Sequence, residues 1–259
     1  MDTPLLFTPF TLRGVTLRNR IAMSPMCQYS ARDGMADYWH LVHLGSRAVG
    51  GVGLVMVEAT AVTPQGQISP GCLGLWKDEH IEPLARIASF VRSQGAVPGI
   101  QLAHAGRKGS CHASWAGGEP LTAREGAWEV LSASDIPFDA RSPAPRAADA
   151  VEIDLLLAAY ADAARRAVAA GFDIVELHGA HGYLLHQFLS PLSNRRTDDF
   201  GGGVANRPRL TRLAASTLRR NLPERMPLFV RLSATDWVGG GWSLPEAQRL
   251  AAELQAGGG

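Results

Sequence analysis

The stretch Phe172-Asp-Ile-Val-Glu-Leu177, followed at once by His178-Gly-Ala-His181-Gly-Tyr183, is the most informative part of this sequence. Its first six residues are typical of a buried strand in a parallel sheet. The next six contain two imidazoles, His178 and His181, and the phenol of Tyr183. The spacing of the two histidines predicts that they lie on the same side of a helical turn. Imidazole N–H groups can hold a carbonyl or phenolate oxygen, and a tyrosine O–H can donate a proton beside it. This combination at the end of a strand indicates the reduction of something conjugated to a carbonyl.

Two other interpretations of the histidine pair remain open at this point. A histidine near a helix start is usually structural, and a short motif such as HxxH is a weak signal. Histidines at this spacing can also share a zinc ion, which needs one or two further ligands. The three cysteines, Cys27, Cys72 and Cys111, show no paired spacing that would supply them.

Composition places the chain among ordinary globular proteins. Its 259 residues are 46% hydrophobic and 19% charged, with a net charge of +1, so a large core is feasible. The charges form no basic cluster, which argues against nucleic acid or a membrane surface as a partner. Residues 1–7 lack the features of a signal peptide, and no run of about 18 apolar residues could span a membrane. Cysteines without paired spacing predict a cytoplasmic location.

Apolar, β-branched runs alternate with amphipathic stretches along the whole chain. The predicted strands are 20–26, 53–60, 96–104, 172–178 and 228–234. The predicted helices are 38–50, 79–94, 152–170, 206–221 and 244–255. Gly95 and Gly171 should end helices, and Ser243 with Pro245 should begin the last one. This order predicts a parallel sheet covered by helices.

Two further segments lie outside this alternation. Residues 10–12 and 15–17 are expected to form a small hairpin before the first strand. Residues 108–150 are rich in Gly, Pro, Ser and Ala and include Trp115 and Trp128. A connection this long is usually functional or disordered. We expect it to extend over the rim of the sheet after the third strand, where it could cover a ligand.

The candidate site residues fall at the carboxyl ends of the predicted strands. They are Ser24–Cys27, Ala59, Gln101 with His104, His178 and Arg231. Barrels of the (β/α)₈ type build their active sites at this rim. A Rossmann sheet also carries ligands there, but the sequence has no G-x-G-x-x-G between a strand and a helix. The barrel is therefore the favoured fold.

Several longer motifs resemble the old yellow enzyme family of NADH:flavin oxidoreductases and NADPH dehydrogenases. The matching stretches are Arg18–Tyr29, Val57–Thr60, Gln101–Arg107, His178–Tyr183, Ser190–Gly202 with Asn206 and Arg207, and Arg231–Trp237. The pair Cys27 and Tyr29 is similar to the bacterial branch that includes xenobiotic reductase A. Phe200 departs from the family, which usually has a tyrosine there, and residues 203–205 alter the segment that follows. A dihydroorotate-type dehydrogenase, another flavin barrel, lacks support from these motifs.

The resemblance implies an FMN-dependent enzyme that takes hydride from NADPH or NADH and reduces C=C bonds conjugated to carbonyls. It implies that Ser24, Pro25, Met26 and Cys27 pass along the flavin ring. Cys27 would tune the flavin potential, and Ala59 would touch the ring. Gln101 would bond the pyrimidine edge and Arg231 would face the N1/O2 region. For Gln101 the alternative is a bond to neighbouring backbone, and for Arg231 it is a structural ion pair.

The resemblance also assigns the substrate side of the site. The carbonyl oxygen of an enone would lie between His178 and His181, against Gly179 and Ala180. Tyr183 would donate the proton, and Tyr29 would help to bind the substrate from the opposite side. The partners implied are small molecules, and an oligomer of identical chains is compatible with the sequence. No metal is implied.

The resemblance predicts a (β/α)₈ TIM barrel of which residues 1–259 form one domain holding the first five βα units and the hairpin. In the family, strands six to eight follow, and the loops after strands seven and eight hold the FMN phosphate. We therefore expect a truncated member that binds FMN weakly. The alternative is a non-catalytic fragment with little or no flavin binding.

Overall fold

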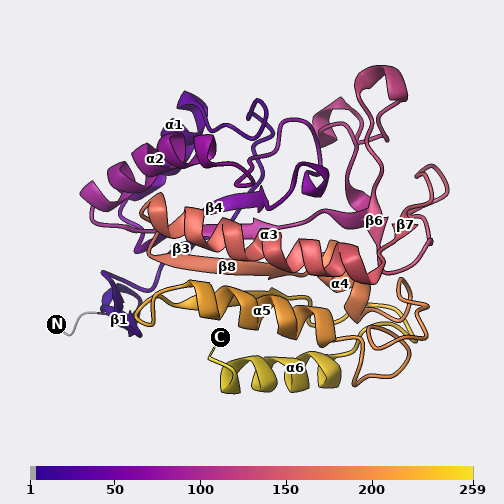
Figure 1. Cartoon of the computed structure of the whole chain (residues 1–259). Coiled ribbons are helices and arrows are strands. Elements are labelled where there is room, and N and C mark those ends of the chain that lie inside the picture. Colours follow the sequence, from indigo (N-terminus) through magenta and orange to yellow (C-terminus); the bar gives the residue numbers. More distant parts are fainter. Residues whose placement is uncertain (1–3, 259) are drawn as a thin grey trace.

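Five parallel strands lie side by side in the order β3-β4-β5-β8-β9 in the computed structural model, which describes residues 4–258 (Figure 1). The strands are β3 (Ala22–Met23), β4 (Leu54–Ala61), β5 (Val97–Ala103), β8 (Ile174–Gly179) and β9 (Leu228–Leu232). Every residue of β4 and β8 is buried, as apolar strands covered on both faces require. The parallel α/β fold predicted from the sequence is thus confirmed.

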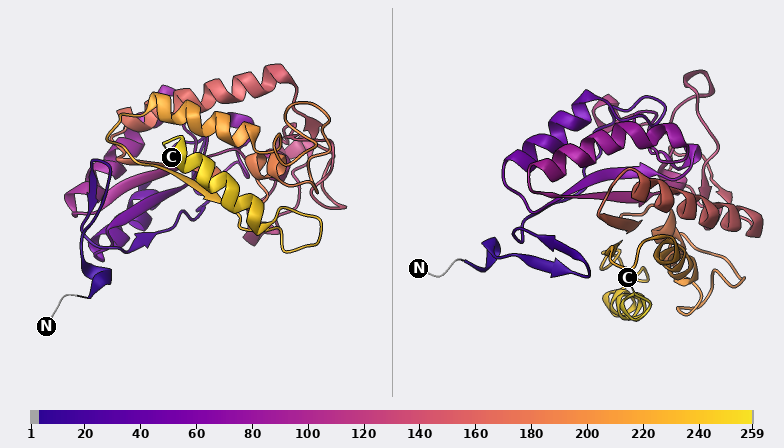
Figure 2. Two further views of the ribbon diagram at one scale, coloured as in Figure 1. Left: turned by 90° about the horizontal axis from the view of Figure 1, so that it is seen from below. Right: turned by 60° about the vertical axis from the view of Figure 1, so that its left-hand side comes forward.

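The helices cover one face of this curled sheet (Figure 2). They are α1 (Tyr38–Val49), α2 (Ile81–Ser93), α3 (Ala150–Ala169), α4 (Leu184–Leu189), α5 (Arg209–Asn221) and α6 (Leu244–Ala256). Single-turn 3₁₀ helices are Leu5–Phe7, Pro64–Gly66, Asp78–His80, Gly106–Lys108, Ser114–Ala116 and Ala123–Glu125. The arrangement has the character of a TIM barrel. That it represents the first five of eight units stays a prediction, and the domain predicted over 1–259 includes residues 1–3 and 259, which lie outside the described residues.

Local sequence signals account for the ends of the helices. Capping boxes begin α1 at Asp37, α3 at Asp149 and α6 at Ser243. After α2 and α3, Gly95 (φ +77°) and Gly171 (φ +82°) adopt the left-handed conformation that suits glycine and turn the chain into β5 and β8. The predicted caps at Gly95, Gly171 and Ser243 are therefore confirmed.

The predicted hairpin is formed by β1 (Phe10–Leu12) and β2 (Val15–Leu17). Its turn attaches to the connection that precedes β9, because the amide of Gly14 donates to the carbonyl of Arg225 over 2.9 Å. The hairpin therefore lies at the amino end of β9, opposite the carboxyl ends where the candidate site residues fall.

The structure departs from the predicted elements in two details. Only Ala22–Met23 of the predicted strand 20–26 pairs with a neighbour, since β3 lies at the edge of the sheet. Helix α4 was not predicted, because its six residues are too few for a helical period to stand out. The segment 108–150 also contains a parallel pair of short strands, β6 (Leu131–Ser132) and β7 (Arg146–Ala147).

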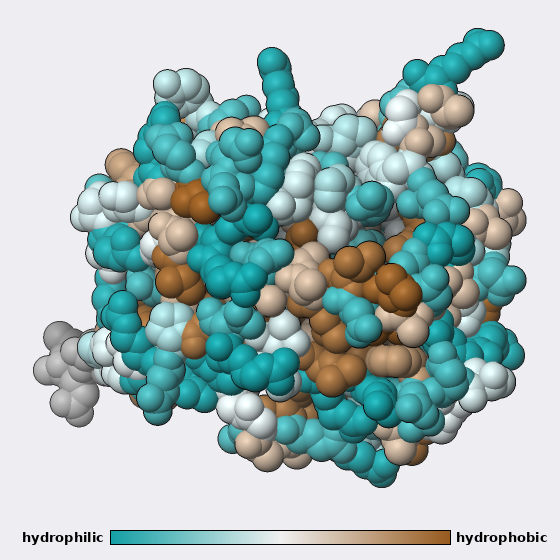
Figure 3. Space-filling view, viewed as in Figure 1, coloured by the Kyte–Doolittle hydropathy of each residue, from teal (hydrophilic) through white to brown (hydrophobic). Residues whose placement is uncertain are grey.

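One core joins the sheet to its helices. Tyr160 of α3 and Leu218 of α5 are fully buried within it, and Trp242 before α6 is almost so. Outside the core, apolar side chains gather over α3 in Figure 3, and the exposed apolar residues of that helix include Val151 and Leu155. Within residues 4–258 no helix combines the length and apolarity that crossing a membrane requires.

The burial of Leu218 gives a test of this packing. Leu218→Ala should lower the free energy of unfolding by about 2–5 kcal/mol, since it removes buried methyl groups and leaves a cavity. Leu155→Ala makes the same change at a side chain that is 64% exposed, and should cost less than about 1 kcal/mol. Urea denaturation followed by circular dichroism measures both. Equal losses for the two variants would contradict the packing described here.

Candidate active site

The register of the parallel strands places the candidate residues on one face of the sheet. Ala59 of β4 pairs with Gln101 of β5, which pairs with Glu176 of β8. Two residues further along β8, His178 pairs with Arg231 of β9. Register partners point to the same side, and so do residues two apart in a strand. These five side chains therefore meet near the carboxyl ends of four neighbouring strands.

A buried carboxylate, which the sequence analysis missed, holds two of these residues. Glu176 accepts a hydrogen bond from Nε2 of Gln101 at 2.6 Å. It also forms a bidentate ion pair with Arg231, whose Nε lies 2.7 Å from Oε1 and whose Nη2 lies 3.1 Å from Oε2. The alternative of a structural ion pair for Arg231 is thus present in the structure. An acidic residue within an apolar strand, two positions before His178, was the available signal.

His178, His181 and Tyr183 lie against one another at the end of β8. The ring centroids of His178 and His181 are 5.2 Å apart, and those of His178 and Tyr183 are 5.0 Å apart. The expected helical turn is wrong, because His178 belongs to β8 and His181 adopts a left-handed conformation (φ +60°). The rings meet because the chain reverses at His181, and not because of helical spacing.

Burial fixes the protonation of this cluster. It lowers the pKa of His178 to about 3, with smaller effects from His181 and Arg231. Nδ1 of His178 accepts the amide hydrogen of Ala180 at 3.3 Å, which leaves the ring proton on Nε2. Burial also raises the pKa of the Tyr183 phenol above its ordinary value. The cluster thus offers neutral donors near neutral pH.

Lys108 is a second residue that the sequence analysis did not single out. Its Nζ donates to the carbonyl oxygen of His181 at 3.0 Å and lies 4.7 Å from the centre of the Tyr183 ring. It also lies 5.0 Å from the ring centre of Phe138, which belongs to the segment 108–150. That segment therefore reaches the tyrosine side of the cluster.

Tyr29 and Tyr183 both line a cavity of about 250 Å³ beside Lys108 and Phe138. Tyr29 has a positive φ (+48°) and packs edge-on against Trp115, with ring centroids 5.5 Å apart. A larger hollow, of about 370 Å³, lies away from this cluster between α3 and the segment 108–150. His104, the residue after β5, lines that hollow and does not line the cavity of about 250 Å³.

Ser24, Pro25, Met26 and Cys27 follow the edge strand β3, where Met26 is 47% exposed. Burial, with the nearby Glu58 charge, raises the pKa of the Cys27 thiol to about 12. Cys27 is therefore a neutral thiol and not a thiolate nucleophile. In residues 4–258 no group of three or more His, Cys, Asp or Glu side chains is placed to hold a metal ion, so the zinc interpretation finds no support there.

Comparison with known proteins gives a match over residues 5–257 to the NADH:flavin oxidoreductase / NADH oxidase family. The chain is 50% identical over 236 residues to an NADH:flavin oxidoreductase of Gibberella zeae, covering 90% of this chain and 57% of that protein. It is 47% identical over 239 residues to an NADPH dehydrogenase of a Geobacillus species, covering 92% of this chain and 65% of the relative. The chain thus spans less than two thirds of the length of both relatives.

Solved structures show the same resemblance at lower identity. Morphinone reductase in complex with tetrahydroNAD superposes with a TM-score of 0.85 at 27% identity, over 99% of this chain and 72% of that one. An old yellow enzyme from a Pichia species superposes with the same TM-score at 26% identity, over 97% of this chain and 67% of that one.

The lowered pKa of His178 makes a titration prediction. Below pH 6.5, the ordinary pKa of histidine, His178 is protonated in the unfolded chain. In the folded chain it stays neutral down to about pH 3, because its pKa there is about 3. This group therefore makes the protein less stable as the pH falls from 6.5 towards 3. Nitrogen-15 NMR of the imidazoles should show His178 neutral down to pH 5. His40, whose pKa the Glu58 and Asp37 carboxylates raise despite burial, serves as the control. A His178 midpoint near 6.5 would contradict the buried position.

Proposed function

The chain belongs to the NADH:flavin oxidoreductase / NADH oxidase family, the old yellow enzyme family, and we propose that it reduces C=C bonds conjugated to carbonyl groups with NAD(P)H. The observation that carries this proposal is the contact of His178, His181 and Tyr183 at the carboxyl end of β8. These residues put two hydrogen-bond donors and a proton donor beside one another. The comparisons favour this enzyme over the non-catalytic fragment considered as the alternative.

The residues at the strand ends have the chemistry to hold FMN, the cofactor of this family. Among the hydrogen bonds of the described residues, Oε1 of Gln101 and Nη1 of Arg231 take no part, which leaves a carbonyl acceptor and a guanidinium donor at the rim. This pair matches an imide edge, which offers N–H and C=O groups side by side. We propose that Gln101 and Arg231 hold that edge, that Ala59 touches the ring, and that the backbone of residues 24–27 runs along it.

FMN when bound supplies the hydride chemistry that joins oxidation of NAD(P)H to reduction of the double bond. The protein's part is to bind and polarise the substrate. His178 and His181 donate to the carbonyl oxygen, on which negative charge grows as the double bond is reduced. Loss of one such donor commonly costs about 10²–10³ in rate. Because burial keeps His178 neutral, it donates a hydrogen bond without adding a charge to the site.

Tyr183 provides the proton that completes the reduction. Its raised pKa keeps the phenol protonated at neutral pH, so the proton is available when the substrate carbon becomes basic. Tyr29, across the cavity of about 250 Å³, is proposed to contact the substrate from the other side. The segment 108–150 is proposed to be a rim excursion. Its Phe138 would limit the space in the cavity beside Tyr183.

The function is tested with the purified chain supplied with FMN. NADPH consumption should increase when 2-cyclohexenone is added in the absence of oxygen, and cyclohexanone should have no effect. The saturated ketone has the same carbonyl and lacks the double bond, so it controls for simple binding. No difference between the two ketones would contradict the proposal.

Tyr183→Phe tests the proton donor separately from the hydride donor. Enone-dependent turnover should fall by about 10²–10⁴-fold, the usual contribution of a positioned acid. NADPH consumption in air without enone should change little, because this activity does not require the transfer of a proton from Tyr183 to a substrate carbon. If both activities fell equally, Tyr183 would not be the specific proton donor.

A further inference from the structure

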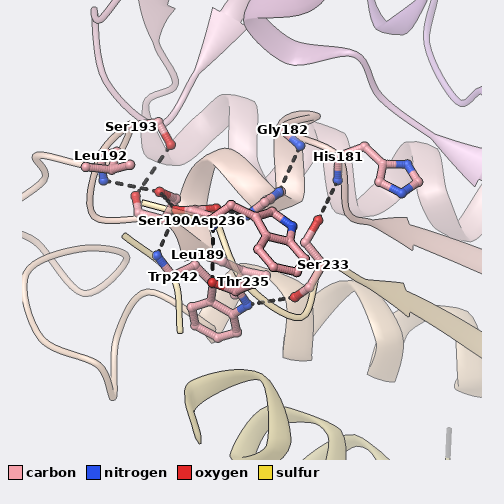
Figure 4. Close-up of polar contacts among 12 residues, drawn as sticks. His181, Gly182, Leu189, Ser190, Leu192, Ser193, Ser233, Thr235, Asp236 and Trp242 are labelled. Carbon is pink, nitrogen blue, oxygen red and sulfur yellow. Dashed lines mark hydrogen bonds and ion pairs between the residues drawn. The ribbon is translucent and has the colours of Figure 1, made fainter. Parts of the chain in front are cut away.

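A chain of polar contacts joins the segment after β8 to the segment after β9 (Figure 4). At its centre is His186 of α4, which is 6% exposed. Its Nδ1 accepts the amide hydrogen of Gly182 at 2.8 Å, and its Nε2 lies 2.8 Å from Oδ1 of Asp236. An imidazole that accepts at Nδ1 carries its proton on Nε2. That atom is in close polar contact with the Asp236 carboxylate, although the contact lacks the direction of a hydrogen bond.

Asp236 accepts two hydrogen bonds at its other oxygen. Oδ2 accepts the Ser190 hydroxyl at 2.6 Å and the amide of Trp242 at 2.7 Å. The indole of Trp242 donates to the carbonyl of Ser233 at 3.0 Å. The hydroxyl oxygen of Ser233 in turn accepts the amide hydrogen of His181 at 2.9 Å. The contacts thus begin at Gly182 and return to its neighbour His181.

The two amides held in this way belong to an unusual turn. His181 (φ +60°) and Gly182 (φ +72°) are both left-handed, which suits glycine but strains a residue with a Cβ. Such a conformation persists where the surroundings over-determine it. Here Ser233 holds the His181 amide, His186 holds the Gly182 amide, and Lys108 holds the His181 carbonyl.

We infer that His186 and Asp236 are positioning residues that fix the turn at His181 and Gly182, and so set the direction of the His181 ring and the place of Tyr183. This inference rests on the proposed function of His181 and Tyr183. It goes beyond that function because it assigns a role to two side chains that do not belong to the proposed substrate or FMN contacts. The competing explanation is that the pair only attaches α4 to the segment after β9.

The chemistry of the carboxylate makes Asp236→Asn the decisive change. Oδ2 of Asp236 accepts two hydrogen bonds and Oδ1 faces Nε2 of His186, whereas an asparagine amide has one acceptor and one donor side. If the NH₂ group faces His186, it meets the proton on Nε2, and moving that proton to Nδ1 opposes the Gly182 amide. If the NH₂ group faces Trp242, it opposes the backbone N–H of Trp242, and two donors then face each other. Each orientation therefore breaks at least one contact that leads to the turn.

The first measurement is amide hydrogen exchange of the chain without FMN, followed by NMR. In Asp236→Asn, exchange at His181 and Gly182 should accelerate by about tenfold or more, while amides of β4 and β5 stay unchanged. Ser233→Ala, which removes only the acceptor for the His181 amide, should accelerate exchange at His181 more than at Gly182. Asp173→Asn is the matched control, since Asp173 pairs with Arg92 before β8 begins, away from the carboxyl end of that strand.

The second measurement compares two activities of the FMN-supplied chain. Asp236→Asn should lower kcat/KM for the enone by about 10- to 100-fold, as misplaced catalytic groups do. NADPH consumption in air should stay near that of the unaltered chain. Unchanged exchange at His181 and Gly182 would overturn the inference. So would faster exchange with no selective loss of enone reduction, because the pair would then have only a structural role.

The two proposals fail in different ways. If the unaltered chain reduces no enone, the proposed function fails and the role assigned to the pair fails with it, whatever the amides show. If the unaltered chain reduces the enone and Asp236→Asn retains full kcat/KM, only the inference about His186 and Asp236 fails.

Discussion

The parallel register of β4, β5, β8 and β9 is the constraint on which the candidate site depends. It aligns Ala59, Gln101 and Glu176 in one row and sets His178 beside Arg231. Side chains alternate along a strand, so a slip of one residue would move a whole set to the other face. Backbone hydrogen bonds between the strands therefore decide which functional groups can meet.

Burial then favours the neutral form of several titratable groups at the site. Desolvation favours the neutral form, which lowers the pKa of His178 and raises those of Tyr183 and Cys27. The charges that remain are compensated, because Glu176 is paired with Arg231 and also accepts from Gln101. A buried carboxylate without such partners would be costly. The result is a site of neutral donors held beside a satisfied ion pair.

The sequence predicted the sheet well because its signals are local. Apolar runs and the glycines after α2 and α3 are patterns of residues that are close together in the sequence. From them, four of the five strands were predicted to within two residues at each end. The edge strand was predicted too long, since its apolar residues do not reveal how few of them find a partner. The site motif was identified, but the conformation of His181 was not. Helical spacing assumes ordinary backbone angles, and only the following Gly182 hinted at a left-handed turn.

The contacts that orient the site were harder to predict than the residues in it. Glu176 was detectable in principle, because an acidic residue stands in a buried strand on the same face as His178. Asp236 and His186 carry no such pattern, since they lie on separate segments that meet only when β8 and β9 are paired. A sequence pattern predicts which residues lie at the carboxyl end of a strand. The direction in which a side chain then points depends on contacts between loops, and those follow from the fold as a whole.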